Sequence, residues 1–254
     1  MNSALRGHVA AIMMVFGLMS APVCAGEVRV AVASNFAPPM ESIAALFQQQ
    51  SGHTVKASFG PSGKFYTQIV GGAPFDVFLS ADEEIPKRLM KEGLAVGGSR
   101  FVYALGTLVL WSAQPGLVDD KASVLRNGSF NKLAIANPGY APYGMAAKET
   151  LEKLIMWNAI QGKLVKGENV ALAYQLAATE QADLAFVALS QIMREGKVTE
   201  GSWWRVPSEL HKPIRQSAVL LSAAKDRDAA QAFLIFLKSP EAAAIIHSFG
   251  YELP

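Results

Sequence analysis

The segment FGPSGKFY (Phe59–Tyr66) places a serine, glycines and a lysine between an expected strand and an expected helix. Such a turn suggests a phosphate-binding loop, but the nucleotide-binding motif needs glycine, four residues, and then Gly-Lys-Ser/Thr. Gly60 and Gly63 are too close together for that motif, and Phe65 stands where the magnesium-binding hydroxyl belongs. The GxSxG turn of serine hydrolases also fails, because Lys64 occupies the place of its second glycine. The sequence therefore argues against nucleotide hydrolysis and against a serine nucleophile.

The same segment retains the features of an anion site. Ser62 opens a helix, and the first N–H groups of a helix have no partner within it and form its electropositive end. Gly63 would let a ligand approach the backbone closely. Helix starts of this kind bind anions, although Ser62 alone is also consistent with a simple helix cap. We interpret Lys64 as a solvated side chain of the first turn.

Three other strand-to-helix junctions repeat this arrangement. They lie at Ser34-Asn35, Tyr143-Gly144 and Asn169-Val170. Ligands of open parallel sheets bind beyond the carboxyl ends of the strands. If each half of the molecule carries two junctions, all four can converge on one cleft between the halves.

Alternating strand and helix patterns run through the chain and predict an α/β fold with largely parallel sheets. The middle block, roughly residues 108–216, has a complete pattern of strands and helices of its own. The last residues of the chain have the pattern of helices, which we expect to pack on a sheet formed by strands outside that block. We therefore predict two lobes joined by two crossing segments, within Tyr103–Leu110 and Pro213–Leu221. Lobe I comprises residues 26–107 and 217–254, and lobe II comprises residues 108–216.

The first 25 residues have the pattern of a cleavable signal peptide. Arg6 precedes a short apolar run (Val9–Met19), and Val23 and Ala25 suit a cleavage site before Gly26. That run of about 11 residues is shorter than the roughly 20 that span a membrane. We expect export to the periplasm and a mature chain of 229 residues.

Few residues of the mature chain suit metal or nucleic-acid chemistry. The only cysteine, Cys24, leaves with the signal peptide, so neither a disulfide nor a thiolate site is expected. The net charge of the full chain is +2, and its basic residues form no stripe or run. Both observations argue against a nucleic-acid partner. The run Asp82–Glu84 fits a helix start better than a metal site. The histidines are scattered and form no ligand pair, at His8, His53, His211 and His247.

Five segments together resemble the ModA family of periplasmic molybdate-binding proteins of ABC transporters. They read VASNF, PSGKFYTQIVGGAPFDVFLSADE, GSRFVYALGTLVLWSAQPG, NPGYAPYGMAAKETL and ADLAFVALSQI. The resemblance covers essentially the whole mature chain. It implies a two-lobed type II periplasmic binding protein fold with the ligand cleft between the lobes.

The resemblance also implies the ligand-binding residues. The family's contacts fall on Ser34, Ser62, Tyr143 and Val170, and Asn35 fits a subset in which asparagine follows the first hydroxyl residue. Ala188 departs from the family, because many members have a tyrosine there that donates its hydroxyl to the anion. We expect Asn35 or the Tyr143 region to replace that donor, with Tyr143 contributing a backbone N–H.

The function implied is capture of molybdate, and of tungstate, for delivery to an ABC-type permease in the inner membrane. The chain is expected to be a monomer that is not an enzyme, needs no cofactor and binds molybdenum only as its oxyanion. A donor-only site suits molybdate, which has no proton near neutral pH, whereas phosphate would favour an acceptor. Another tetrahedral oxyanion, such as sulfate or thiosulfate, is the alternative ligand.

Overall fold

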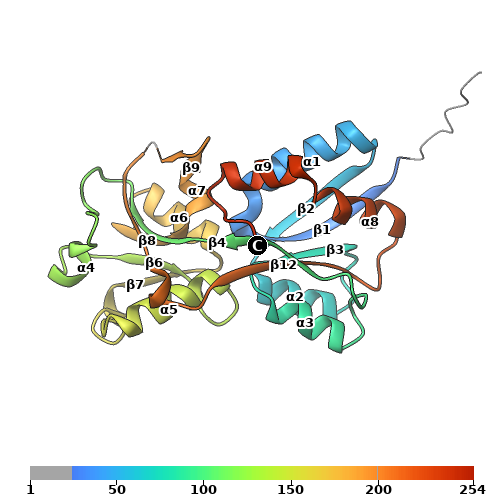
Figure 1. The fold of residues 1–254 in the computed structure, drawn as a ribbon. Coiled ribbons are helices and arrows are strands. Elements are labelled where there is room, and N and C mark those ends of the chain that lie inside the picture. Colours follow the sequence, from blue (N-terminus) through green and yellow to red (C-terminus); the bar gives the residue numbers. More distant parts are fainter. Residues whose placement is uncertain (1–24, 199) are drawn as a thin grey trace, which may run out of the picture.

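The computed structural model describes residues 25–198 and 200–254, which form two five-stranded sheets side by side (Figure 1). The predicted signal peptide lies outside this part except for its last residue. The first sheet has the order β2-β1-β3-β12-β4 and the second the order β11-β5-β8-β6-β7. The strands of the first are β1 (Glu27–Ala33), β2 (Thr54–Gly60), β3 (Val77–Ser80), β4 (Phe101–Gly106) and β12 (Ile214–Leu220). Those of the second are β5 (Leu108–Ser112), β6 (Leu133–Ala136), β7 (Leu164–Gly167), β8 (Leu184–Ala188) and β11 (Ser202–Arg205).

The prediction of largely parallel sheets is right for only part of each sheet. Strands β2, β1 and β3 are parallel, as are β7, β6 and β8. Strand β12 is antiparallel to β3 and β4, and β5 is antiparallel to β8 and β11. The chain passes directly from β4 into β5 and returns as β12. Because the chain leaves the first lobe through β4 and re-enters it through β12, these two strands run in opposite directions and pair antiparallel.

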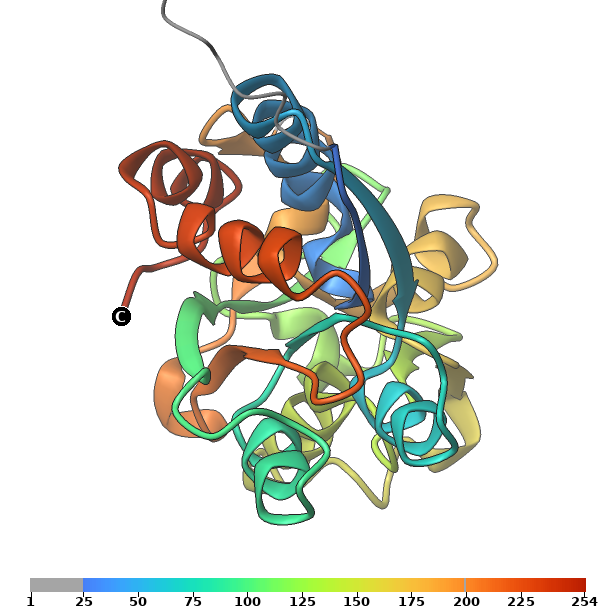
Figure 2. The same ribbon diagram turned by 90° about the vertical axis from the view of Figure 1, so that its right-hand side faces the viewer.

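Helices cover both faces of each sheet, so strands such as β3 and β6 are buried throughout. Viewed along the molecule, α1, α8 and α9 lie on one face of the first sheet and α2 and α3 on the other (Figure 2). These helices are α1 (Ala37–Ser51), α2 (Ser62–Val70), α3 (Glu84–Lys91), α8 (Arg227–Phe236) and α9 (Pro240–Ser248). The second lobe contains α4 (Ser123–Asn127), α5 (Pro142–Lys153), α6 (Val170–Ala178) and α7 (Leu189–Ile192). Short elements complete the fold: the 3-10 helices η1 (Ser34–Phe36), η2 (Gln161–Lys163) and η3 (Ser208–Leu210), and the hairpin β9 (Met193–Arg194) and β10 (Lys197–Val198).

Local sequence signals account for the ends of α1. Its prolines stand in the first turn, where a missing N–H costs little. Gly52 ends it in the left-handed region with φ of 74°, which glycine adopts without strain. Among the described residues no single helix is long and apolar enough to cross a membrane, although α8 and α9 together, bent by 63°, have the length and composition.

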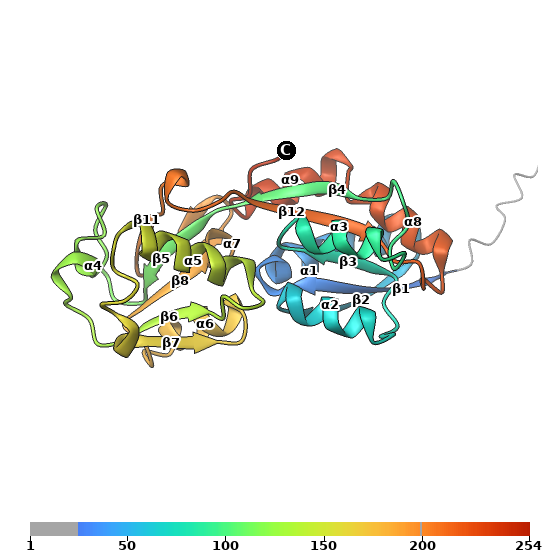
Figure 3. The same ribbon diagram turned by 90° about the horizontal axis from the view of Figure 1, so that it is seen from below.

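The strand register brings the predicted junctions together. Ala33 at the end of β1 lies opposite Gly60 at the end of β2, so η1 and α2 start side by side. In the second sheet Ala136 lies opposite Gly167, which places the starts of α5 and α6 at one edge. Strands β4 and β12 run between the lobes along one side of the molecule (Figure 3). The two carboxyl edges therefore face each other across the space that these strands bridge.

Candidate functional site

The five predicted binding residues line one small cavity between the lobes. Ser34, Asn35 and Ser62 come from the first lobe, and Tyr143 and Val170 from the second. The cavity leaves about 10 Å³ for the centre of a water-sized sphere. A volume of this size holds a single small molecule or ion. The structure thus brings all five residues together, while their contact with a ligand stays a prediction.

In the first lobe, η1 and α2 present their first N–H groups at this cavity. Helix α2 begins at Ser62, and Pro61 before it is extended. The next two N–H groups of α2 are used elsewhere: Gly63 donates to the carbonyl of Tyr140 and Lys64 to that of Pro61. The N–H of Ser62 is therefore the donor that this helix start leaves for the cavity.

In the second lobe, α5 and α6 complete the set of helix starts. Helix α5 begins with Pro142, which has no N–H, so Tyr143 carries its first donor. Helix α6 begins at Val170, and the side chain of Asn169 accepts from the N–H of Leu172 at 3.0 Å. That cap satisfies the third donor of α6 and leaves the first, on Val170, directed at the cavity.

Two serine hydroxyls add side-chain donors. The hydroxyl oxygen of Ser62 accepts from the N–H of Ala81 at 3.0 Å, so its own proton remains free to donate. The hydroxyl of Ser34 makes no hydrogen bond to another residue of the described chain. Both side chains are buried, Ser62 completely. Two hydroxyl protons are thus available to an acceptor in the cavity.

Among the described residues, those that line the cavity carry no carboxylate, ammonium or guanidinium group. Besides the five predicted residues they are alanines, prolines, a glycine and Asn169. The phenol of Tyr143 is the one ionisable side chain among these described lining residues, and burial raises its pKa well above the usual value. A ligand therefore meets neutral dipoles, and the donors among them favour an anion without a charged partner.

The side chain of Asn35 does not serve as the replacement donor that the sequence suggested. Its amide nitrogen donates to Gln216 at 2.8 Å and to the hydroxyl of Tyr251 at 2.9 Å, so both of its protons are taken. The Tyr143 hydroxyl likewise lies 3.5 Å from the Gln216 amide nitrogen. Asn35 and Tyr143 can therefore offer only their backbone N–H groups to a ligand in the cavity, as the sequence had suggested for Tyr143. Ala188 is buried and is not among the lining residues.

Sequence reasoning missed Gln216, Tyr251 and Ser190. Gln216 carries no clear signal, because it stands between the polar residues Arg215 and Ser217 in β12. Ser190 and Tyr251 lie in segments whose pattern gives no hint of a role. All three are buried at 2% exposure or less.

Gly63 and Lys64 have roles different from those predicted. The N–H of Gly63 donates across the cleft to the carbonyl of Tyr140 at 2.9 Å, and a methyl group on Gly63 would lie 2.6 Å from the Tyr140 Cβ. The glycine thus permits close approach of the other lobe. Lys64 is not merely solvated, because its Nζ lies 2.6 Å from Glu168 Oε1 of the second lobe.

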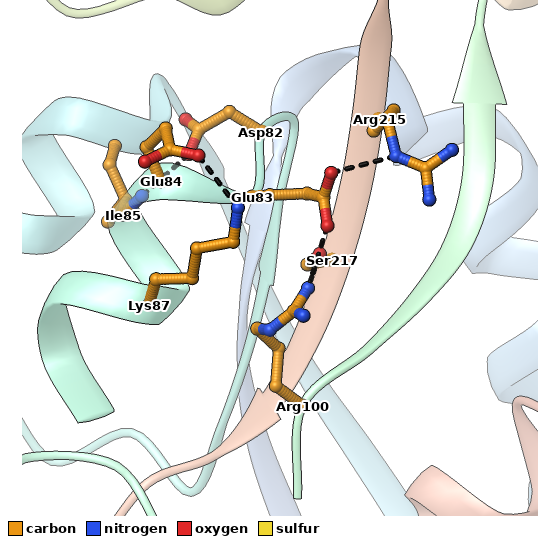
Figure 4. Close-up of polar contacts among 8 residues, drawn as sticks. All are labelled: Asp82, Glu83, Glu84, Ile85, Lys87, Arg100, Arg215 and Ser217. Atoms are coloured by element: carbon orange, nitrogen blue, oxygen red, sulfur yellow. Dashed lines mark hydrogen bonds and ion pairs between the residues drawn. The ribbon is translucent and has the colours of Figure 1, made fainter. Parts of the chain in front are cut away.

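Glu83 ties the crossing strands to the first lobe (Figure 4). Its carboxylate accepts from Arg100, just before β4, at 2.9 Å and from Arg215 on β12 at 2.7 Å. Burial opposes ionisation of Glu83, but these two bonds prevail and hold its pKa below the usual value. Asp82 accepts from the N–H of Ile85 at 2.7 Å, which confirms the predicted helix start. Burial raises the pKa of Asp82.

Comparisons with known proteins agree with this geometry. The family model for bacterial extracellular solute-binding proteins matches residues 28–252. The chain is 53% identical to the molybdate-binding protein ModA of Azotobacter vinelandii, covering 93% of this chain and 94% of the relative. It is 52% identical to ModA of Rhodobacter capsulatus, covering 97% and 96%. The solved periplasmic molybdate-binding protein of Azotobacter vinelandii superposes with a TM-score of 0.88 and 43% identity, covering 89% of this chain and 99% of that one.

The start of α5 depends on Gly144, which gives a testable prediction. A methyl group there would collide with the carbonyl oxygen of Ala136 at the end of β6. We expect Gly144→Ala to lower the free energy of unfolding by about 1–3 kcal/mol, measured by urea denaturation. The matched control is Gly162→Ala, where an added methyl meets no atom within 4 Å. Equal stabilities of the two variants would contradict the close packing of α5 on β6.

Proposed function

Since the chain belongs to the bacterial extracellular solute-binding proteins, and within them to the ModA group of molybdate-binding proteins, we propose that it captures molybdate between its lobes and delivers it to an ABC-type permease. The observation that carries the proposal is the convergence of four helix starts, two from each lobe, on one buried cavity. Oriented N–H groups and hydroxyls would surround the ion from both sides. The protein acts in this proposal as a carrier without catalysis.

The strength of such a site follows from its donors. A hydrogen bond to a charged group contributes about 1.5–3 kcal/mol, so six or seven would contribute on the order of 10–20 kcal/mol. Ordering and closure cost several kcal/mol. The remainder is enough for tight binding without a paired cation.

The lining chemistry selects among oxyanions. Molybdate carries no proton near neutral pH, so it needs donors and offers none. Phosphate is partly protonated and would require an acceptor such as a carboxylate, which the lining residues lack. Tungstate matches molybdate in charge, shape and nearly in size, and we include it among the ligands. Sulfate or thiosulfate remains the alternative, to be separated by cavity size.

The cellular setting of the proposal rests on the family and on the N-terminal sequence. We propose that residues 1–25 are removed as a signal peptide and that the mature protein works as a monomer in the periplasm. We also propose residues 26–107 and 217–254 as lobe I and residues 108–216 as lobe II. Lobe closure on the ion would be the state that the permease recognises.

Calorimetric titration of the purified mature protein tests the function directly. We expect saturable binding of molybdate and tungstate with one ion per chain, and binding of sulfate that is weaker by orders of magnitude. Molybdate should also raise the melting temperature, because a ligand that binds only the folded state stabilises it. Preferential binding of sulfate would overturn the assignment in favour of the alternative.

Removing either serine hydroxyl should weaken binding, but only the loss of the Ser62 hydroxyl should also lower the stability of the protein. Ser34→Ala and Ser62→Ala should each weaken molybdate binding by about 1.5–3 kcal/mol, since each loses a hydrogen bond to a charged group. Ser62→Ala should also lower the melting temperature, because the N–H of Ala81 loses its acceptor. The exposed Ser58→Ala on β2 is the control for both measurements. Unchanged affinity in both cavity variants would mean that backbone donors alone bind the ion.

The Lys64–Glu168 pair joins the lobes, so it should affect release of the ion. We expect Lys64→Glu to speed molybdate dissociation severalfold in stopped-flow fluorescence. The effect should be modest and should fade at high salt, because both side chains are nearly half exposed. Combining it with Glu168→Lys restores the opposite charges and should restore the slow rate. Failure of the double variant to recover would argue against an ion pair across the cleft.

A further inference from the structure

Behind the anion cavity lies a cluster of buried polar side chains, which we call the polar hub. All its members are 3% exposed or less. They come from both lobes, from the crossing strands and from the C-terminal segment. The members are Asn35 on η1, Tyr103 on β4, Tyr143 on α5, Ser190 on α7, Gln216 on β12 and Tyr251.

Gln216 connects the two lobes within the hub. Its side-chain oxygen accepts from Asn35 at 2.8 Å and from the hydroxyl of Tyr103 at 3.1 Å. Its side-chain nitrogen faces the Tyr143 hydroxyl at 3.5 Å. The pairing of β12 with β4 shifts register between Gln216 and Ser217, and such a bulge redirects a side chain. One amide on a crossing strand thus contacts a cavity-lining residue of each lobe.

Tyr251 holds Asn35 from the other side. Its hydroxyl accepts from the Asn35 side chain at 2.9 Å and lies 2.9 Å from the Asn35 carbonyl oxygen. The same carbonyl accepts from the hydroxyl of Ser190 at 2.8 Å. Both ends of Asn35 are therefore fixed, which leaves little freedom for the direction of its N–H.

We propose that Gln216 and Tyr251 are positioning residues for the anion site, which fix the N–H groups of Asn35 and Tyr143 in their binding directions without touching the ion. The inference rests on the proposed function, because it concerns how the same cavity achieves its affinity. Donors that are already oriented need no reorganisation when the ion enters, which is the source of their strength.

The hub is electrically neutral, which suits its place behind an anion. Its titratable members are phenols. Burial raises the pKa of Tyr251 to about 12 and those of Tyr103 and Tyr143 well above their usual value. Wild-type binding should therefore show no dependence on the hub between about pH 5.5 and about pH 8.5.

Affinity measurements on hub variants test the proposal. Tyr251→Phe keeps the ring that packs against Phe36 at 5.5 Å but removes the hydroxyl. Gln216→Met keeps the volume but removes both polar atoms. We expect each to weaken molybdate binding at least about tenfold, the scale of one buried hydrogen bond left unmade.

A control separates positioning from general stability. Thr150→Val removes a buried hydroxyl on α5 that bonds within its own helix and lies outside the hub. It should lower the melting temperature of the ligand-free protein and change the dissociation constant less than about threefold.

Gln216→Glu adds a readout that a purely structural role would not change. Burial should raise the pKa of the introduced carboxyl above the usual value. Above that pKa it is charged and repels the dianion, whereas below it the neutral acid again accepts from Asn35. Binding by this variant should recover as the pH falls. Asp82 and the Glu83–Arg215 pair near the hub are also present in the wild type, whose profile is therefore the baseline.

The outcomes are distinct. If the wild type does not bind molybdate, the proposed function fails before the hub is tested. If the wild type binds and Tyr251→Phe and Gln216→Met bind equally well, the positioning role is wrong. Equal loss of affinity in the Thr150→Val control would also overturn it, since lost stability would then explain the effect. A flat pH profile for Gln216→Glu at reduced affinity would count against it as well.

Discussion

The arrangement depends on one constraint: unpaired N–H groups at separate helix starts can serve a single ion only if they point at the same place. Within one parallel sheet, the register supplies two such starts at one edge, as Ala33 opposite Gly60 illustrates. A second sheet must supply the others from the opposite direction. The two-lobed fold meets this requirement, because it sets the carboxyl edges of two sheets face to face. The cavity is small and neutral as a consequence, since its wall is built from the first turns of helices.

The crossing strands determine how well the two edges stay aligned. Strands β4 and β12 pair with each other, and the C-terminal segment pairs with β4 through Leu105 and Glu252. Glu83 fastens both crossing strands to the first lobe through two arginines, Arg100 and Arg215. Because Gln216 lies on one of these strands, the polar hub links the helix starts to the same segment that joins the lobes. Strand β12 therefore both joins the lobes and carries the side chain that contacts the helix starts of the site.

The sequence predicted those parts of the molecule that follow from local patterns. Gly52, the prolines of α1 and the repeated junctions at Ser34, Ser62, Tyr143 and Val170 each have a local physical reason, and the structure places the junction residues in one cavity. The antiparallel pairing of β12 and β5 could not be read in this way, because the residue pattern of a strand does not show the direction of the strands beside it. The partners of Asn35 and Lys64 were equally hidden. Gln216 and Tyr251 lie 181 and 216 residues from Asn35 in the chain, and Glu168 belongs to the other lobe.

Rigidity behind the cavity bears on selectivity as well as affinity. Sulfate and molybdate have the same charge and the same tetrahedral shape, so a site of neutral donors distinguishes them only through distance. A flexible site would contract around the smaller ion, sulfate, and would no longer distinguish it from molybdate. Fixed donors cannot contract, so the smaller ion is left with longer and weaker hydrogen bonds. The bonds that hold Asn35 at both its side chain and its carbonyl oppose such contraction in the first lobe. The Gly63–Tyr140 contact limits how far the lobes can close. Size selection in this fold therefore belongs to the residues behind and beside the cavity as much as to those that line it.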